Sequence, residues 1–185
     1  MPEEDPTASA YAPLAKFYAQ EQLPPLDFEE VAGDDLPQPA LHLLVHNRDM
    51  TTRLERYHRS PISLKALYIS MEPDSYFREV VLIADKSGKP VEYGAIEIHL
   101  EAFPEWLGKR IRDGKQPLGG ILVEEKFPFV SKPSTYFRIQ SDQHIQKQLE
   151  LPSPITLYGR ANLLCKEDGT PLANIVEILP PDPDA

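Results

Sequence analysis

The sequence predicts a mixed protein of the α+β class whose strands pair antiparallel. Two observations indicate this class. Several runs of about ten residues are rich in β-branched and aromatic side chains, whereas other segments carry apolar residues at helical spacing. Short turn sequences also join neighbouring β-rich runs, and a connection of a few residues can join only antiparallel strands.

The first half of the chain is expected to place short helices before a three-stranded meander. Asp49 is a suitable cap for the last of these helices, and Pro61 ends the helical region. The turn sequence at 85–90 joins the last two strands. The expected helices lie at Ala12–Gln20, 40–46 and 50–57, and the expected strands at Ile62–Met71, Tyr76–Ala84 and 91–100.

The second half returns to helical spacing before the last strands. A proline at the first turn of a helix and a hairpin signal at 167–170 mark two of the boundaries. The expected elements are a helix over 103–113, a helix from Pro117, a strand over 126–140, a helix over 141–149 capped by Ser141 or Asp142, and paired strands over 155–165 and 172–179.

Charge is distributed unevenly along the chain. The 19 basic and 29 acidic residues give a net charge of −10, but residues 1–39 hold nine of the acids and one base. We therefore divide the chain into an acidic, proline-rich arm at 1–39, partly disordered or draped over the surface, a neutral domain at 40–180 and an acidic tail at 181–185. The acidity argues against a nucleic-acid partner. No apolar run approaches the ~18 residues of a membrane helix. The first ten residues lack a signal-peptide pattern and the chain has a single cysteine, so we expect a cytoplasmic protein.

Several kinds of chemistry are unsupported by the sequence. Cys165 is the single cysteine and lies in an expected strand, where it is interpreted as a small buried apolar residue. His42 and His46 have helical metal-pair spacing without a third ligand, so a surface or capping role is favoured. The other histidines, His144 among them, have no evident partner. No dinucleotide, P-loop or nucleophile-elbow motif is present, and we expect no metal or organic cofactor.

Two charged residues occur where the strand pattern places apolar side chains. Counting alternate residues puts Arg78 on the same strand face as Tyr76 and Val80, and Glu177 on the same face as Ile175. A buried charge costs several kcal/mol unless it is paired or meets a charged ligand. Arg78 and Glu177 therefore either pair with each other, sit at a sheet rim, or line a ligand site.

Two loop-to-helix junctions offer backbone N–H groups that can bind an anion. One is Asp49-Met50-Thr51-Thr52, and the other is Gln116-Pro117-Leu118-Gly119-Gly120. The two glycines would let a ligand or a neighbouring strand approach the backbone closely. Either junction is also compatible with an ordinary turn. Arg138 is a further candidate anion contact, although a surface position is favoured for it.

These motifs resemble, in the same order, those of the chorismate lyase family. The resemblance rests on Asp49-Met50-Thr51, Tyr76-Phe77-Arg78-Glu79, Gln116-Pro117-Leu118-Gly119 and Val176-Glu177-Ile178-Leu179-Pro180, and it covers residues 41–180. It implies an antiparallel sheet with helices packed over it and a closed pocket between them. It also implies that Arg78 holds the ring carboxylate of chorismate, with help from the backbone at Met50, Leu118 and Gly119, while Glu177 faces the other end of the ring.

The implied reaction is the loss of pyruvate from chorismate, which leaves 4-hydroxybenzoate or a related aromatic acid. Arg78 and Glu177 are the expected catalytic residues, and no cofactor is needed. The alternative is a non-catalytic module of the same fold that senses an aromatic acid in a transcription regulator. A third class, a protein adaptor that uses the proline-rich arm, has only composition in its favour. The expected partner in the first two cases is a small carboxylic acid.

Overall fold

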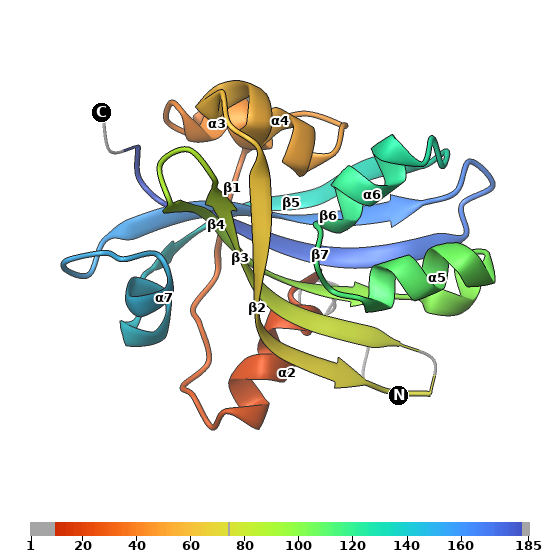
Figure 1. Ribbon diagram of the computed structural model, residues 1–185. Coiled ribbons are helices and arrows are strands. Elements are labelled where there is room, and N and C mark those ends of the chain that lie inside the picture. The colour runs from red at the N-terminus through yellow and green to blue at the C-terminus, as the bar shows by residue number, and fades with distance from the viewer. Residues whose placement is uncertain (1–9, 74, 183–185) are drawn as a thin grey trace.

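A computed structural model describes residues 10–73 and 75–182. Seven antiparallel strands form one sheet in the order β1-β5-β6-β7-β4-β3-β2 (Figure 1). This confirms the α+β class predicted from the sequence. The strands are β1 (Glu29–Val31), β2 (Ile62–Met71), β3 (Tyr76–Ala84), β4 (Lys89–Ile98), β5 (Val130–Gln140), β6 (Thr156–Cys165) and β7 (Pro171–Leu179).

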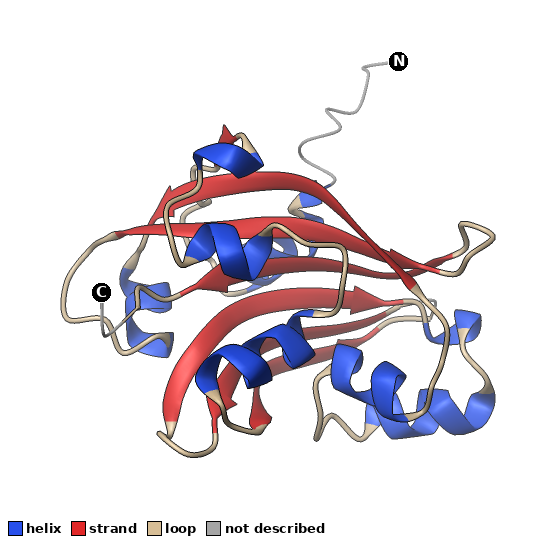
Figure 2. Ribbon diagram, turned by 90° about the horizontal axis from the view of Figure 1, so that it is seen from above, coloured by secondary structure: helices blue, strands red, loops and turns tan. Residues whose placement is uncertain are grey.

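The helices cover both faces of this sheet. Figure 1 shows α3, α4 and α6 above the strands and α2 and α7 below them, and Figure 2 shows the helices lying across strongly curved strands. No helix in the described ranges has the length and apolar character needed to cross a lipid bilayer. The helices are α2 (Ala12–Gln20), α3 (Ala40–Leu44), α4 (Met50–His58), α5 (Glu105–Arg112), α6 (Leu118–Glu124) and α7 (Gln143–Gln148), with 3₁₀ turns η1 (Gly33–Asp35) and η2 (Leu100–Ala102).

Most predicted boundaries agree with the structure, and the differences have local causes. The Asp49 side chain accepts a hydrogen bond from the Thr52 backbone N–H at 2.7 Å, as predicted for a helix cap. Asp142 rather than Ser141 caps α7. The strand expected from residue 126 begins at Val130, because Lys126 has a left-handed backbone (φ 54°) that turns the chain out of α6.

The described part of the acidic arm is packed more closely than its composition indicates. Leu14 and Phe17 on α2 are each only 1% exposed, in the apolar core beneath the sheet. β1 adds a strand to β5, and there Glu29 forms a bidentate ion pair with Arg138 at 2.8 and 2.5 Å. Arg138 is therefore an exposed surface residue, as favoured from the sequence. Burial of the apolar face of α2 therefore holds this part of the arm against the sheet, despite the acidic residues around it.

The upper face of the sheet holds two apolar clusters with a polar gap between them. One cluster joins α5 and α6 to the strand ends around Ile98, and the other joins α3 and α4 to the strand ends around Leu82. Cys165 is buried in β6, which confirms its interpretation as a small apolar residue. The charged side chains of the candidate site lie in the gap.

Candidate functional site

A cavity of about 60 Å³ lies between the upper face of the sheet and the beginnings of α4 and α6. Aliphatic side chains from the sheet and both helices make up much of its wall. The charged and polar lining residues are Asp49, Thr51, Arg78, Glu92, Asn162 and Glu177.

Arg78 is a buried cation without an acidic partner among the described residues. Its side chain is on the same face as Val80 and Leu82, as alternate counting predicts, and the residue is 1% exposed. The guanidinium Nη1 donates a hydrogen bond to the Gln116 carbonyl at 3.3 Å, while Nε is buried with no partner in the described chain. Burial lowers the Arg78 pKa below its usual range because it disfavours the charged form. Arg78 therefore lines the cavity with a guanidinium whose Nε has no hydrogen-bond partner in the described chain.

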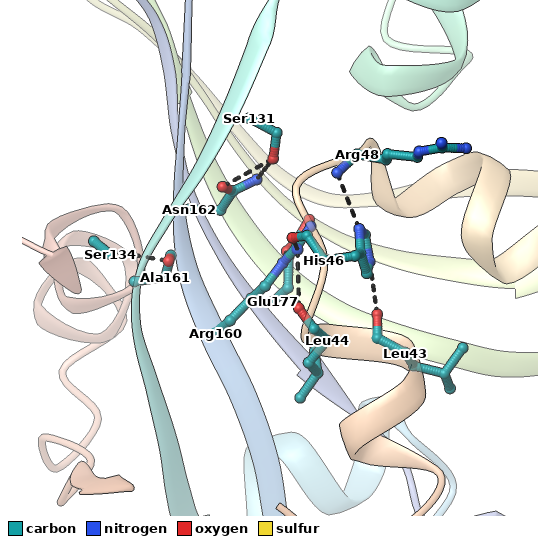
Figure 3. A network of polar contacts seen from close by, with 10 residues as sticks. All are labelled: Leu43, Leu44, His46, Arg48, Ser131, Ser134, Arg160, Ala161, Asn162 and Glu177. Atoms are coloured by element: carbon teal, nitrogen blue, oxygen red, sulfur yellow. Dashed lines mark hydrogen bonds and ion pairs between the residues drawn. The ribbon is translucent and has the colours of Figure 1, made fainter. Parts of the chain in front are cut away.

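Glu177 pairs with Arg160, not with Arg78. The two residues lie directly opposite each other on β7 and β6, and Arg160 Nε donates to Glu177 Oε2 (Figure 3). Arg160 is fully buried, and its Nη1 also donates to the carbonyls of Leu44 at 3.1 Å and His46 at 3.0 Å. This corrects one of the alternatives left open by the sequence, the pairing of Arg78 with Glu177. Arg160 was not identified from the sequence.

A second carboxyl, Glu92, lies beside Glu177 and was also missed. Gly94 is opposite Glu177 in the β4–β7 pairing, so Glu92, two residues away, is a diagonal neighbour of Glu177. Glu92 is 5% exposed, and its Oε2 is buried with no hydrogen-bond partner in the described ranges. Burial raises its pKa well above the ordinary value, the charge of Glu177 raises it further, and Arg160 opposes the rise. Burial thus favours the protonated form of the Glu92 carboxyl over its ionised form.

The two predicted helix starts meet at the cavity. Met50 begins α4, Leu118 begins α6, and both line the cavity with Gly119. A Cβ atom at position 119 would lie 3.0 Å from the Asp49 Cβ. Glycine at this position therefore lets α6 approach the cap of α4 closely. The close neighbour is this cap, not a strand. All the site residues predicted from the sequence thus share one cavity, and their roles stay predictions.

His46 holds the chain segment that covers Arg160. The Arg48 backbone N–H donates to His46 Nδ1 at 3.1 Å, so Nε2 carries the proton and donates to the Leu43 carbonyl at 2.8 Å (Figure 3). Burial and the nearby cations Arg160 and Arg53 lower the His46 pKa to about 4. His46 therefore has the neutral capping role favoured from its sequence context.

A separate polar cluster lies on the opposite face of the sheet. Glu79 is fully buried, and its Oε1 accepts hydrogen bonds from Tyr93 at 2.7 Å and His144 Nε2 at 2.5 Å. Glu21, at the end of α2, is close to both Glu79 and His144, and one ligand atom from each of the three lies within 4.8 Å of the others. His144 therefore has partners that the sequence did not reveal. The cluster has the donor types of a metal site, although Glu79 is already engaged by Tyr93 and His144.

Comparison with known proteins supports the fold. No protein-family model matches the chain, and no curated protein matches it by sequence. Among solved structures it is similar to YydK of Bacillus subtilis, a possible transcriptional regulator, with a TM-score of 0.50 and 9% identity over 65% of this chain and 59% of that one. It is also similar to the effector domain of PhnF from Mycobacterium smegmatis, with a TM-score of 0.50 and 12% identity over 74% and 90% of the two chains.

A third similar structure is the gene product SA0254 of Staphylococcus aureus, with a TM-score of 0.50 and 12% identity over 67% of this chain and 87% of that one. The match to YydK spans less than two thirds of that regulator. At this level of identity the comparisons establish a shared fold. The chain thus shares the sheet-and-helix fold of these structures, and this fold agrees with the chorismate lyase resemblance only in a coarse sense.

Proposed function

We propose that this chain binds a small cyclic carboxylic acid in the cavity above the sheet. The observation that carries the proposal is Arg78, a guanidinium that is 1% exposed and has a buried, unpartnered Nε. A buried cation without a counter-ion costs several kcal/mol, and a bound carboxylate would offset that cost. The planar guanidinium suits a carboxylate because it can donate two parallel hydrogen bonds.

The size of the cavity indicates that binding requires movement. The cavity has about 60 Å³, whereas an engineered apolar cavity that binds benzene has roughly 150 Å³. A six-membered ring would therefore need α4 and α6 to move away from the sheet. These helices meet at the tight contact between Asp49 and Gly119, so one displacement there would enlarge the cavity.

The favoured form of this proposal is a non-catalytic effector-sensing module. The structural similarity to the effector domain of PhnF supports it, because that domain has the same fold over most of its length. The cavity would then respond to an aromatic acid by a shift of α4 and α6. Binding without chemical change is the expected behaviour of such a module.

Chorismate lyase activity is a second candidate, favoured by the buried carboxyls of Glu92 and Glu177 and by the four short motifs. In this reaction the ring C–O bond to the enolpyruvyl group breaks, and its electron pair leaves with the oxygen. The ring carbon that bears the hydroxyl loses a proton, and the enolpyruvyl methylene gains one, which gives pyruvate and 4-hydroxybenzoate. No oxidant, reductant or water is consumed. Glu177 would hydrogen-bond the reacting end of the ring while Arg78 orients its carboxylate.

The test is to titrate the protein with 4-hydroxybenzoate by calorimetry and to incubate it with chorismate while pyruvate is followed by a coupled assay. The sensing module is supported if the wild type binds 4-hydroxybenzoate but releases no pyruvate from chorismate, and if Arg78→Met abolishes the binding. Pyruvate release that falls by at least about 100-fold in Arg78→Met and Glu177→Gln supports the lyase. If the protein neither binds the acid nor turns over chorismate, the proposed function is wrong. Arg138→Met is the matched control, because Arg138 lies outside the cavity and is exposed.

A further inference from the structure

We propose that Glu92 receives the second polar group of the ligand, donating a hydrogen bond from its carboxyl to a hydroxyl or ether oxygen at the end of the ring opposite the carboxylate. This inference rests on the proposed function, because it assumes that Arg78 holds that carboxylate. It adds a specificity-determining residue and, for the sensing module favoured above, defines the ligand class as an acid with one anionic group and one neutral oxygen at its far end, a class that excludes the dicarboxylate chorismate.

The first step is that Glu177 is already committed to another partner. Its Oε2 accepts from Arg160, and Arg160 is in turn held by two backbone carbonyls above it. Drawing Glu177 toward a ligand would loosen an ion pair whose two side chains are 0% and 5% exposed. Glu92, in contrast, has no ion pair or hydrogen bond in the described part of the chain at its buried Oε2.

The second step is the position of Glu92 relative to Arg78. Arg78 is opposite Ile96 on β4, and Glu92 is four residues farther along the same strand, opposite Leu82. Strand geometry separates the Cα atoms of Arg78 and Glu92 by roughly 14 Å. Both side chains line the same cavity, so they approach it from opposite ends. A ligand held by its carboxylate at Arg78 would therefore direct its far end toward Glu92.

The third step is the chemistry of a neutral carboxyl. The protonated form of Glu92, which burial favours, has one O–H donor, whereas the Glu177 carboxyl beside it already accepts from Arg160. A hydroxyl or ether oxygen satisfies that donor, and a ligand hydroxyl can also donate to a carboxylate oxygen. A second carboxylate at the far end would instead meet two carboxyl groups, of which only Glu177 has a cationic partner. The pair thus selects a neutral oxygen there.

The test measures selectivity rather than affinity alone. Calorimetry at pH 7 compares 4-hydroxybenzoate with benzoate, which lacks the far oxygen. We expect the wild type to favour 4-hydroxybenzoate about five- to tenfold, the amount that one hydrogen bond contributes. Glu92→Leu should reduce this ratio to about one, and Glu92→Gln should keep most of it because the amide still donates. Glu101→Leu, which removes an exposed acid outside the cavity, is the control.

The possible results separate the two proposals. If the wild type binds both acids and Glu92→Leu keeps the preference, or if the wild type shows no preference, the role of Glu92 is wrong while the proposed function stands. If the wild type binds neither acid, the proposed function fails, and the role of Glu92 fails with it. Thermal unfolding of each variant verifies folding, and Glu92→Met replaces the leucine variant if that protein lacks a cooperative transition.

Discussion

Arg160 and Glu177 lie opposite each other on neighbouring strands and form a buried ion pair. The side chains are 0% and 5% exposed, and Arg160 also binds the carbonyls of Leu44 and His46. The pair therefore joins the centre of the sheet to the segment that follows α3. Because Glu177 also lines the cavity, the pair positions one of the charged groups in its wall.

Removing one partner of this pair should strongly destabilise the protein. Arg160→Met leaves Glu177 buried without a counter-ion, and we expect the free energy of unfolding to fall by about 3–5 kcal/mol. Urea denaturation followed by circular dichroism measures this change. The double variant Arg160→Met, Glu177→Leu removes both charges and should lie much nearer to the wild type. A double variant as unstable as the sum of the two single variants would show that the pair has no such coupling.

Glu92 should give the protein a stability that falls as the pH rises. Its pKa is well above the ordinary 4.5 because of burial and the charge of Glu177. A carboxyl with a raised pKa stabilises the folded state when protonated, so its contribution is complete below pH 4.5 and is lost as the pH rises through the folded-state value. In urea denaturation, we expect the free energy of unfolding of the wild type to fall, relative to that of Glu92→Gln, as the pH rises above 4.5. Glu97→Gln, in the same strand but on the other face, is the control. A wild type that gains stability relative to Glu92→Gln as the pH rises would contradict the raised pKa of Glu92.

The Glu79–His144 pair should stabilise the attachment of α2 most between about pH 4.5 and 6.5. The hydrogen bond to Glu79 raises the His144 pKa above 6.5, so this contribution is present below 6.5 and is lost as the pH rises through the folded value. Burial raises the Glu79 pKa, but the His144 and Tyr93 hydrogen bonds outweigh it, so the net pKa is lowered. The Glu79 contribution is present above 4.5 and lost at lower pH.

Hydrogen exchange of the α2 amides measures this attachment. We expect His144→Gln to speed exchange there most at about pH 5 to 6, where the wild-type pair is charged, and progressively less above the folded His144 pKa. His42→Gln, on α3 at the other face of the sheet, controls for the loss of a histidine. Equal effects of His144→Gln at pH 5.5 and at pH 9 would mean that the histidine acts through packing alone.

The sequence identifies the charged residues of the site where strand alternation can be counted. Arg78 and Glu177 stand out because each shares a strand face with aliphatic residues. The same count places Arg160 beside Leu164 on one face of β6, and the short turn before β7 sets the register that brings it opposite Glu177. Counting alternate strand residues could therefore have identified Arg160, although it was not among the predicted site residues.

The proximity of Glu92 and Glu177, in contrast, does not follow from local sequence. β4 and β7 are adjacent in the sheet but are separated by more than seventy residues of sequence, and no local turn fixes their pairing. The partners of His144 come from α2 and β3 for the same reason. Periodicity predicts which face a residue occupies, whereas long-range strand order decides which other charges it meets.

Gly119 and Gly120 provide a matched test of the contact between α4 and α6. Ala is favoured over Gly inside a helix by roughly 0.5–1 kcal/mol, so both alanine variants gain this contribution. A Cβ at position 120 would lie 3.4 Å from the Thr51 Cγ2, which is ordinary contact, whereas at position 119 it would lie 3.0 Å from the Asp49 Cβ. The Asp49 Cβ cannot move without its backbone, and its side chain caps α4.

We therefore expect Gly120→Ala to raise the midpoint of thermal unfolding and Gly119→Ala to lower it, because overpacking costs about 1–3 kcal/mol. Differential scanning calorimetry of the two variants provides the comparison. Since Gly119 also lines the cavity, a ligand that moves α6 outward would relieve the clash, so 4-hydroxybenzoate should raise the midpoint of Gly119→Ala more than that of Gly120→Ala. Equal midpoints for the two variants without ligand would show that α6 is not held against the α4 cap, and the movement proposed for ligand entry would then lose its basis.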